Sequence, residues 1–305
     1  MTGDVARVED TGEALVAEAG GVELMRYVYR PRSPAFEGSK PYAHPLRSRA
    51  GDVVTAYRPH DHRWHKGLQM TASHLSGENF WGGGSYVRER QAYVDLPNVG
   101  TMRHEEFTGP GRERLSWHTQ AGEHWVDEVR ELTVRDVEEG SWALDFSTAM
   151  TNVRGEVLRF GSPTTHGRPM AGYSGLFWRG PRSFTGGTVI AEGGRGGPEM
   201  MGRAAGWLAY AGWHDEVDRA STLLFMAAPG TIWFVRTTPF AAVNPSLAFS
   251  EEVELAAGAT WSHRYRVVVG NGFWDRERLE DYVRGHPFDL PELPEPSEPS
   301  EPEGP

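Results

Sequence analysis

Turn-forming residues interrupt this sequence so often that little room is left for long helices. The 305 residues include 37 glycines and 21 prolines, spread along the whole chain. Between them lie short runs that are rich in aromatic and β-branched residues, which is the pattern of β-strands joined by close turns. The sequence therefore predicts an all-β protein with many strands.

Several of these runs alternate between apolar and polar residues. In 141–153, "SWALDFSTAMTNV", the side chains of Trp142, Leu144 and Phe146 have the same parity and share one face of a strand. We expect further strands at 21–30, 124–137, 231–239 and 260–272. A polar parity favours antiparallel sheets with one wetter face. For a chain of this length, the simplest such arrangement is a large antiparallel β-sandwich of two layers.

One segment near the C-terminus has a helical pattern instead. In 275–286, "DRERLEDYVRGH", Asp275 stands at an N-cap position, and Leu279, Tyr282 and Val283 follow at helical spacing. We therefore expect one short C-terminal helix.

The chain contains no linker that would divide it into several domains. We expect residues 1–20 to be an N-terminal segment and 21–289 to be a single β-sandwich domain. Residues 290–305, "LPELPEPSEPSEPEGP", consist mainly of proline and acidic residues. Such a segment buries no apolar area, so we predict a disordered tail.

Charge and composition exclude several classes of protein. The 31 Lys and Arg against 42 Asp and Glu give a net charge of −11, which repels phosphate backbones, so we expect no nucleic-acid partner. There is no cysteine, which excludes disulfides and thiolate chemistry. The longest apolar stretch, 222–235, is too short to span a bilayer and contains Pro229 and Gly230. With no signal-peptide pattern at the start, we expect a cytoplasmic protein that does not interact with membranes.

The segment 58–68, "RPHDHRWHKGL", is the strongest candidate for a functional site. An imidazole titrates near neutral pH, with an ordinary pKa of roughly 6.5, so His60, His62 and His65 are candidates for proton transfer. Asp61 is a candidate to orient an imidazole or to act as the partner acid. The structural alternative is that these histidines only hold turns. Three histidines within six residues favour function.

A metal site is a second interpretation of the same segment. If the segment is extended, His60 and His62 point to the same side, and an H-x-H pair can chelate a divalent transition metal. The third ligand would be His65 or His166. The charge argues against a metal, because the basic residues of the segment outnumber its one acidic residue, Asp61. Our leading interpretation therefore has no cofactor.

Two further segments are candidates for substrate binding. In 76–90, "SGENFWGGGSYVRER", Glu78 and Asn79 suit hydroxyl recognition, Glu78 is a second candidate for the partner acid, and Trp81 suits stacking on a sugar. The alternative is a hairpin tip with Trp81 in the core.

The second of these segments, 164–180, places polar groups among glycines and aromatics, as in a pocket wall. Its candidates are His166, Arg168, Tyr173 and Arg179, although Arg179 also suits a buried strand position paired with a carboxylate such as Glu131.

Several motifs together resemble a known bacterial family. "PYAHPL", "RPHDHRWHKGL", "NFWGG", "GLFWRG" and the 233–258 region are similar to the family called methane oxygenase PmoA-like, over residues 20 to 275. True particulate methane monooxygenase subunits are membrane proteins and this chain has no spanning segment, so we do not expect methane oxidation. The order of His and Trp motifs also resembles, more weakly, the aldose 1-epimerases. That resemblance implies a β-supersandwich of the galactose mutarotase type, in which His and a carboxylate open a sugar ring.

These observations predict a carbohydrate-active enzyme that uses His and carboxylate acid–base chemistry on a sugar or sugar acid. Its small-molecule carbohydrate would be held by residues that donate hydrogen bonds, carry charge or stack: His44, Arg58, Lys66, Asn79, Trp81, His166, Arg168, Tyr173 and Arg179. Epimerisation, hydrolysis and elimination all remain open, as does the oligomeric state. The alternatives are a metal-dependent, His-ligated oxygenase or hydrolase, and a non-catalytic carbohydrate-binding protein.

Overall fold

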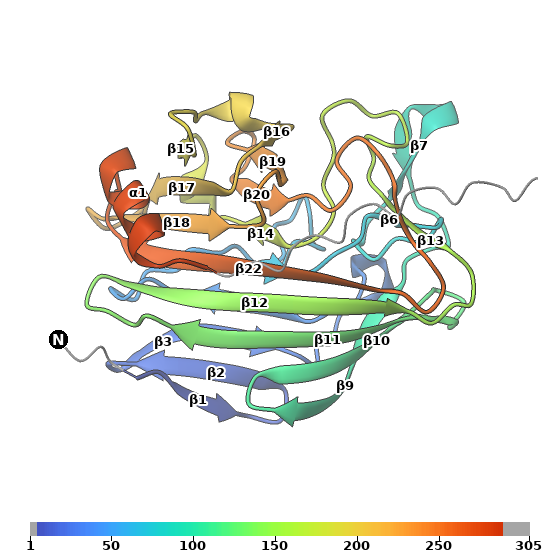
Figure 1. The fold of residues 1–305 in the computed structure, drawn as a ribbon, viewed down its shortest axis with the longest axis horizontal. Coiled ribbons are helices and arrows are strands. Elements are labelled where there is room, and N and C mark those ends of the chain that lie inside the picture. The colour runs from blue at the N-terminus through green and yellow to red at the C-terminus, as the bar shows by residue number, and fades with distance from the viewer. Residues whose placement is uncertain (1–4, 289–305) are drawn as a thin grey trace, which may run out of the picture.

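The computed structural model describes residues 5–288 and shows a nearly all-β molecule with large antiparallel sheets (Figure 1). The expected fold class is confirmed. The first sheet has nine strands, which follow one another across the sheet in the order β1 (Arg7–Asp10), β2 (Ala14–Ala19), β3 (Val22–Val28), β4 (Tyr42–Leu46), β5 (Leu68–Gln69), β14 (Phe177–Arg179), β20 (Ala242–Pro245), β19 (Ile232–Arg236) and β16 (Arg203–Ala204).

The second sheet has eight strands and contains the longest strands of the molecule. Their order is β15 (Thr188–Ala191), β17 (Trp207–Trp213), β18 (Ala220–Met226), β22 (Thr260–Asn271), β12 (Ser141–Asn152), β11 (His124–Arg135), β10 (Arg112–His118) and β9 (Thr101–Gly109). Five of the strands predicted from alternation are β3, β11, β12, β19 and β22, so these predictions are confirmed.

Smaller elements complete the fold. A three-stranded sheet contains β21 (Val253–Leu255), β13 (Leu158–Gly161) and β6 (His74–Leu75), and a hairpin contains β7 (Ser85–Val87) and β8 (Ala92–Val94). Short 3-10 turns are η1 (Ala35–Glu37), η2 (Arg88–Arg90), η3 (Arg182–Phe184) and η4 (Pro198–Met200). The labelled strands β6, β13 and β7 of these two elements lie at one end of the sandwich, at the right in the view of Figure 1.

The main core lies between the two large sheets. Leu24 and Tyr27 of β3 pack in one apolar cluster with Trp142, Leu144 and Phe146 of β12, as the shared parity predicted. At roughly 25 cal/mol per Å² of buried apolar surface, such a layer is the main stabilising contribution.

The one α-helix within residues 5–288, α1 (Arg276–Gly285), covers the outer face of the second sheet. The Asp275 side chain accepts a hydrogen bond from the backbone N–H of Arg278 at 2.9 Å, so the predicted cap is confirmed. Leu279 and Tyr282 pack with Ala143, on the face of β12 opposite Trp142. No helix within residues 5–288 is long and apolar enough to cross a membrane.

The expected domain boundary needs one correction. β1 and β2 pair with β3 in the first sheet, so residues 7–19 belong to the sandwich and the boundary placed at residue 20 falls inside it. The predicted disordered tail at 290–305 lies outside the described residues.

Candidate active site

A cavity of about 420 Å³ lies beside the histidine-rich segment. Its walls come from segments far apart in the sequence. Half of the lining residues are Trp, Tyr or Phe: Trp64, Trp81, Tyr93, Tyr173, Phe177, Phe234 and Phe240. The polar groups on the wall are His62, His65, Arg168 and Arg236. A largely apolar hollow with a few convergent polar groups is the usual form of a small-molecule site.

A smaller hollow of about 260 Å³, beside Trp261 and His263, contains none of the predicted site residues.

The histidine-rich segment is turned, so it lacks the extended geometry that the metal interpretation required. The N–H of His62 donates to the carbonyl of Pro59 at 2.9 Å, and the N–H of His65 donates to the carbonyl of His62 at 3.0 Å. These consecutive turns separate His60 from His62. His60 is exposed, and its Nδ1 lies 2.8 Å from Nη2 of Arg182, outside the cavity wall.

His62 lies in the cavity wall and contacts its neighbour Asp61, which is not part of the wall. Nδ1 of His62 lies 2.9 Å from Oδ2 of Asp61, which places the ring proton on Nδ1 and leaves Nε2 as an acceptor. Burial lowers the pKa of His62, and the Asp61 carboxylate only partly opposes that effect. At neutral pH the ring is therefore an uncharged base whose orientation is fixed by a carboxylate.

His65 has the opposite hydrogen-bonding pattern. It is buried, and its Nδ1 lies 3.2 Å from Nη1 of Arg179, which has only hydrogens to donate. The proton of the neutral ring therefore resides on Nε2. Burial is the main cause that holds the pKa of His65 well below its usual range, and the neighbouring His62 and the charge of Arg179 lower it further. The rings of His62 and His65 stack with centroids 4.7 Å apart, so an acceptor and a donor lie side by side.

Arg179 contacts His65 from behind the cavity wall and does not line the cavity itself. Its guanidinium lies 3.7 Å from the centre of the Phe240 ring, and its Nε has no hydrogen-bond partner. The carboxylate that we considered as its partner, Glu131, pairs instead with Arg112 at 3.4 Å. Arg179 acts on the cavity through His65, and its own side chain is outside the wall.

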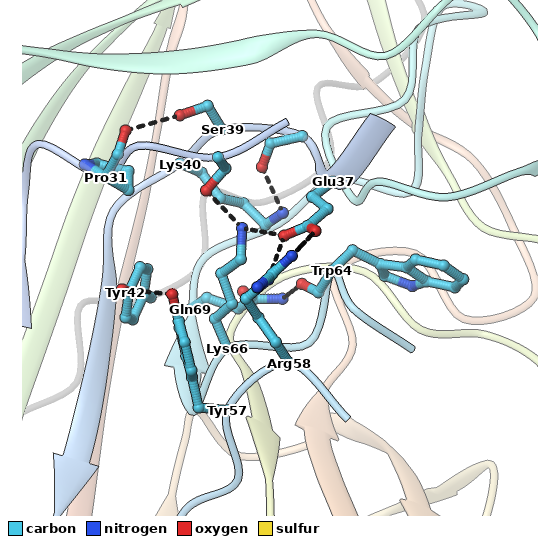
Figure 2. Close-up of polar contacts among 12 residues, drawn as sticks. Pro31, Glu37, Ser39, Lys40, Tyr42, Tyr57, Arg58, Trp64, Lys66 and Gln69 are labelled. Atoms are coloured by element: carbon cyan, nitrogen blue, oxygen red, sulfur yellow. Dashed lines mark hydrogen bonds and ion pairs between the residues drawn. The ribbon is translucent and has the colours of Figure 1, made fainter. Parts of the chain in front are cut away.

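An ion triad anchors the histidine-rich segment to η1, the short turn between β3 and β4 (Figure 2). The buried carboxylate of Glu37 accepts from Nη2 of Arg58 at 2.5 Å and lies 3.2 Å from Nζ of Lys66. Lys66 is fully buried and also donates to Oγ of Ser33 at 2.7 Å. Arg58 and Lys66 were expected to hold substrate, and the structure corrects this: both are occupied by Glu37 and hold the loop between them.

Asn79 holds the neighbouring wall and does not face the substrate. Its Oδ1 accepts from the N–H groups of Trp81 and Gly82 at 2.8 and 2.9 Å, and its Nδ2 donates to the carbonyl of Gly83 at 3.0 Å. The buried amide thus fixes the loop that presents Trp81. Lys40, buried below, donates to the carbonyl of Trp81 at 2.7 Å.

Trp81 combines features of the two interpretations, sugar stacking and core packing, because it lines the cavity but is largely buried. Its ring is 6% exposed and packs on Tyr173, with centroids 4.4 Å apart, and on Phe177, with centroids 4.7 Å apart. Most of the indole is therefore packed, and one part lines the cavity.

Three other predicted residues lie away from the cavity wall. His44, on β4, bonds Oγ1 of Thr55 at 2.9 Å, and burial lowers its pKa to about 4. Glu78 accepts from the N–H of Gln120 at 2.9 Å. His166 stacks on His74 with centroids 3.9 Å apart, in a separate hollow.

The four histidines considered for a metal do not converge. His60 lies on an exposed turn. His62 and His65 stack on one another in the cavity wall, and His166 stacks on His74. Within the described chain, no group of three or more His, Asp or Glu side chains is arranged to hold a metal ion.

The polar edge of the cavity contains two arginines and two tyrosines. Nη1 of Arg168 donates to the hydroxyl of Tyr93, and this hydroxyl lies 2.6 Å from that of Tyr173. Arg168 and Tyr173 line the cavity, and their predicted role in substrate binding stays a prediction. Arg236, from β19, completes the edge.

Sequence reasoning missed half of the wall: Trp64, Tyr93, Phe177, Phe234, Arg236, Pro239 and Phe240. Most of these residues lie in segments that carried the family resemblance, "RWHKGL", "GLFWRG" and "WFVRTTPF", and the resemblance could have identified them. No sequence motif pointed to Tyr93, on β8.

Comparisons with known proteins give a family and distant structural likenesses. Among curated proteins, none matches this sequence significantly. Among solved structures, the GH36 alpha-galactosidase AgaB from Geobacillus stearothermophilus is similar with TM-score 0.40 and 12% identity, over 88% of this chain and 41% of that one. A heparan sulfate lyase HepC mutant from Pedobacter heparinus has TM-score 0.31 and 9% identity, over 90% of this chain and 36% of that one.

The chain thus spans less than half the length of either enzyme. The sequence itself matches one family model over residues 14–284, nearly the whole sandwich. That match tests neither the PmoA-like resemblance nor the aldose 1-epimerase resemblance, and both stay predictions. The chain belongs to DUF6807, a family of unknown function.

Proposed function

We propose that this protein is a carbohydrate-active enzyme that transfers protons on a sugar or sugar acid bound in the aromatic cavity. The observation that carries the proposal is the stacked pair of His62 and His65, which face one cavity with opposite tautomers. Nε2 of His62 takes a proton from the substrate. Nε2–H of His65 donates a hydrogen bond to the oxygen on which charge develops.

The aromatic wall suits a sugar. Trp64, Trp81 and Tyr173 offer flat apolar faces for the C–H side of a pyranose ring, while the cavity's polar edge and the two histidines meet its oxygens. A volume of about 420 Å³ is within the usual range for a small-molecule site.

Proton transfer is favoured over glycoside hydrolysis by the two-carboxylate route. That route places two Asp or Glu side chains on either side of the scissile bond. Among the residues that the structure describes, no Asp or Glu lines the cavity. Asp61 touches His62 from behind and acts as a positioning residue. Epimerisation and elimination both need the proton transfer that the His pair provides.

The test is a turnover screen with a matched histidine control. The protein is incubated with a panel of aldoses and uronic acids, and 1H NMR in D2O follows anomeric exchange, deuterium uptake and bond cleavage. We expect turnover that His62→Gln lowers by about 10²–10⁴-fold, the usual contribution of a general base. His60→Gln should leave the rate within threefold, because His60 lies outside the cavity.

A pH profile separates the positioning role of Asp61 from a structural one. The carboxylate raises the pKa of His62, so Asp61→Asn should move the acidic limb of kcat/KM to lower pH. Binding without turnover would support a carbohydrate-binding protein instead. Absence of both, or equal loss in His60→Gln and His62→Gln, would refute the proposal.

A further inference from the structure

Two arginines of the cavity wall form no ion pair with any carboxylate among residues 5–288. In the described part of the chain, neither Arg168 nor Arg236 forms an ion pair, although both are half-buried. Arg168 bonds only the neutral hydroxyl of Tyr93, and Arg236 lies 5.3 Å from the centre of the Phe234 ring. Half-buried guanidiniums are normally paired, because burying an unpaired charge costs free energy.

The two charges also line the same cavity. Burial lowers the pKa of Arg236, and the positive charge of Arg168 lowers it further. The cavity wall thus contains two guanidiniums and no acidic side chain, in a protein whose net charge is −11. An acidic chain that concentrates unneutralised positive charge at one hollow creates a local field that attracts an anion.

The same edge lies near the proton-transfer residue. The charge of Arg236 contributes to the lowered pKa of His62, after burial and the charge of Arg179. The hydroxyls of Tyr93 and Tyr173, 2.6 Å apart, add donors to this edge. A group held by the two arginines therefore lies in the same cavity as the ring of His62.

From this geometry, and resting on the proposed function, we infer that the substrate is a sugar acid whose carboxylate is bound by Arg168 and Arg236. A guanidinium matches the planar carboxylate with two parallel hydrogen bonds. The sugar ring then lies on the aromatic wall, with one of its carbons presented to His62.

A carboxylate is favoured over a phosphate because it makes the neighbouring C–H bond acidic. When His62 removes the proton from the carbon next to the carboxylate, the electron pair is delocalised into that carboxylate, where two guanidiniums stabilise it. Delivery of a proton from solvent to the opposite face of the same carbon completes an epimerisation, and His62 returns the proton that it took to solvent. In an elimination, the same electron pair forms a C=C bond instead, and the substituent on the adjacent carbon leaves with the electrons of its C–O bond and takes the proton that His62 removed. Neither outcome needs a further reactant.

The experiment compares acidic with neutral sugars by isothermal titration calorimetry. The probes are glucuronate against glucose, galacturonate against galactose, and glucose 6-phosphate as the phosphate arm. The variants are Arg168→Gln and Arg236→Gln, with Arg112→Gln as the control, because Arg112 is an exposed arginine on β10, away from the cavity. Thermal unfolding of each variant checks that the fold is kept.

We expect at least one uronate to bind at least tenfold more tightly than its neutral partner. Arg168→Gln and Arg236→Gln should each weaken uronate binding at least tenfold and change neutral-sugar binding less than threefold, while Arg112→Gln changes neither. Uronates that bind no better than neutral sugars would overturn this inference and leave the proposed function standing. Glucose 6-phosphate binding more tightly than glucuronate would overturn the carboxylate assignment. Binding of none of the five probes would overturn both.

Discussion

The Glu37 ion triad allows the sharpest test of how the site is held. Glu37→Gln keeps the size of the side chain and removes the one negative charge between Arg58 and Lys66. The Glu37 side chain is 3% exposed, Lys66 is 0% exposed and Arg58 is 38% exposed. Breaking a buried pair by removing one partner costs about 3–5 kcal/mol. Arg58 can turn to solvent and Lys66 cannot, so we expect the lower end of that range, about 3 kcal/mol.

Thermal unfolding followed by circular dichroism measures this cost. At about 2 °C per kcal/mol for a chain of this size, Tm should fall by about 6 °C. Glu13→Gln is the control, because its partner Arg32 is 90% exposed and Glu13 is 63% exposed; surface changes of this kind shift stability by about 0.5 kcal/mol or less. If Glu37→Gln changed Tm as little as Glu13→Gln, the triad would not anchor the loop.

The pH dependence of this difference follows from the Glu37 pKa. Burial acts to raise the pKa, but the hydrogen bonds from Arg58 and Lys66 outweigh it, and the net pKa is lowered. The folded state therefore binds the proton less readily than the unfolded state. The stabilisation is present above the unfolded carboxyl pKa of about 4.3 and is lost as pH falls through the lower folded value. The Tm gap between wild type and Glu37→Gln should accordingly narrow below about pH 4.

Three further predictions concern the loops and histidines around the cavity. Gly82→Ala places a Cβ 2.5 Å from the carbonyl oxygen of Glu37 at a φ of +99°, so it should lower stability by more than the roughly 1–3 kcal/mol of backbone strain alone, measured by urea unfolding. Asn79→Ala leaves the backbone N–H of Trp81 without its acceptor and should cost about 1–3 kcal/mol with a shift in tryptophan emission; unchanged emission would contradict this role. Burial lowers the pKa of His74 to about 3, so the unfolded state binds its proton first and stability should fall as pH drops from about 6.5; His74→Gln should flatten that slope in a Tm series, and an equal slope would refute it.

The fold was largely predictable because its signals are local. Alternation in β12 gave the face that contains Trp142 and Leu144, and the Asp275 cap gave the start of α1. The pairing of β5, β14 and β20 at the centre of the first sheet was not predictable, because each is two to four residues long and their partners are distant in sequence.

The site was predictable only in part, because its wall is assembled from distant segments. The three histidines within residues 58–68 indicated a site there. The turns at Pro59 and His62 decide which histidine ring faces the cavity. The alternation of apolar and polar residues does not predict such turns. The charged residues Arg58 and Lys66 looked like ligands for substrate. Their partner Glu37 lies more than twenty residues earlier, so a structural ion triad could not be distinguished from a binding site by sequence alone.

A crystal structure of the protein soaked with its tightest-binding sugar tests the central claim most directly. The account predicts a sugar ring in the aromatic cavity, lying against Trp81 and with one of its atoms within hydrogen-bond distance of Nε2 of His62. A sugar bound elsewhere, with the cavity between His62 and Arg236 filled only by water at saturating ligand, would contradict it.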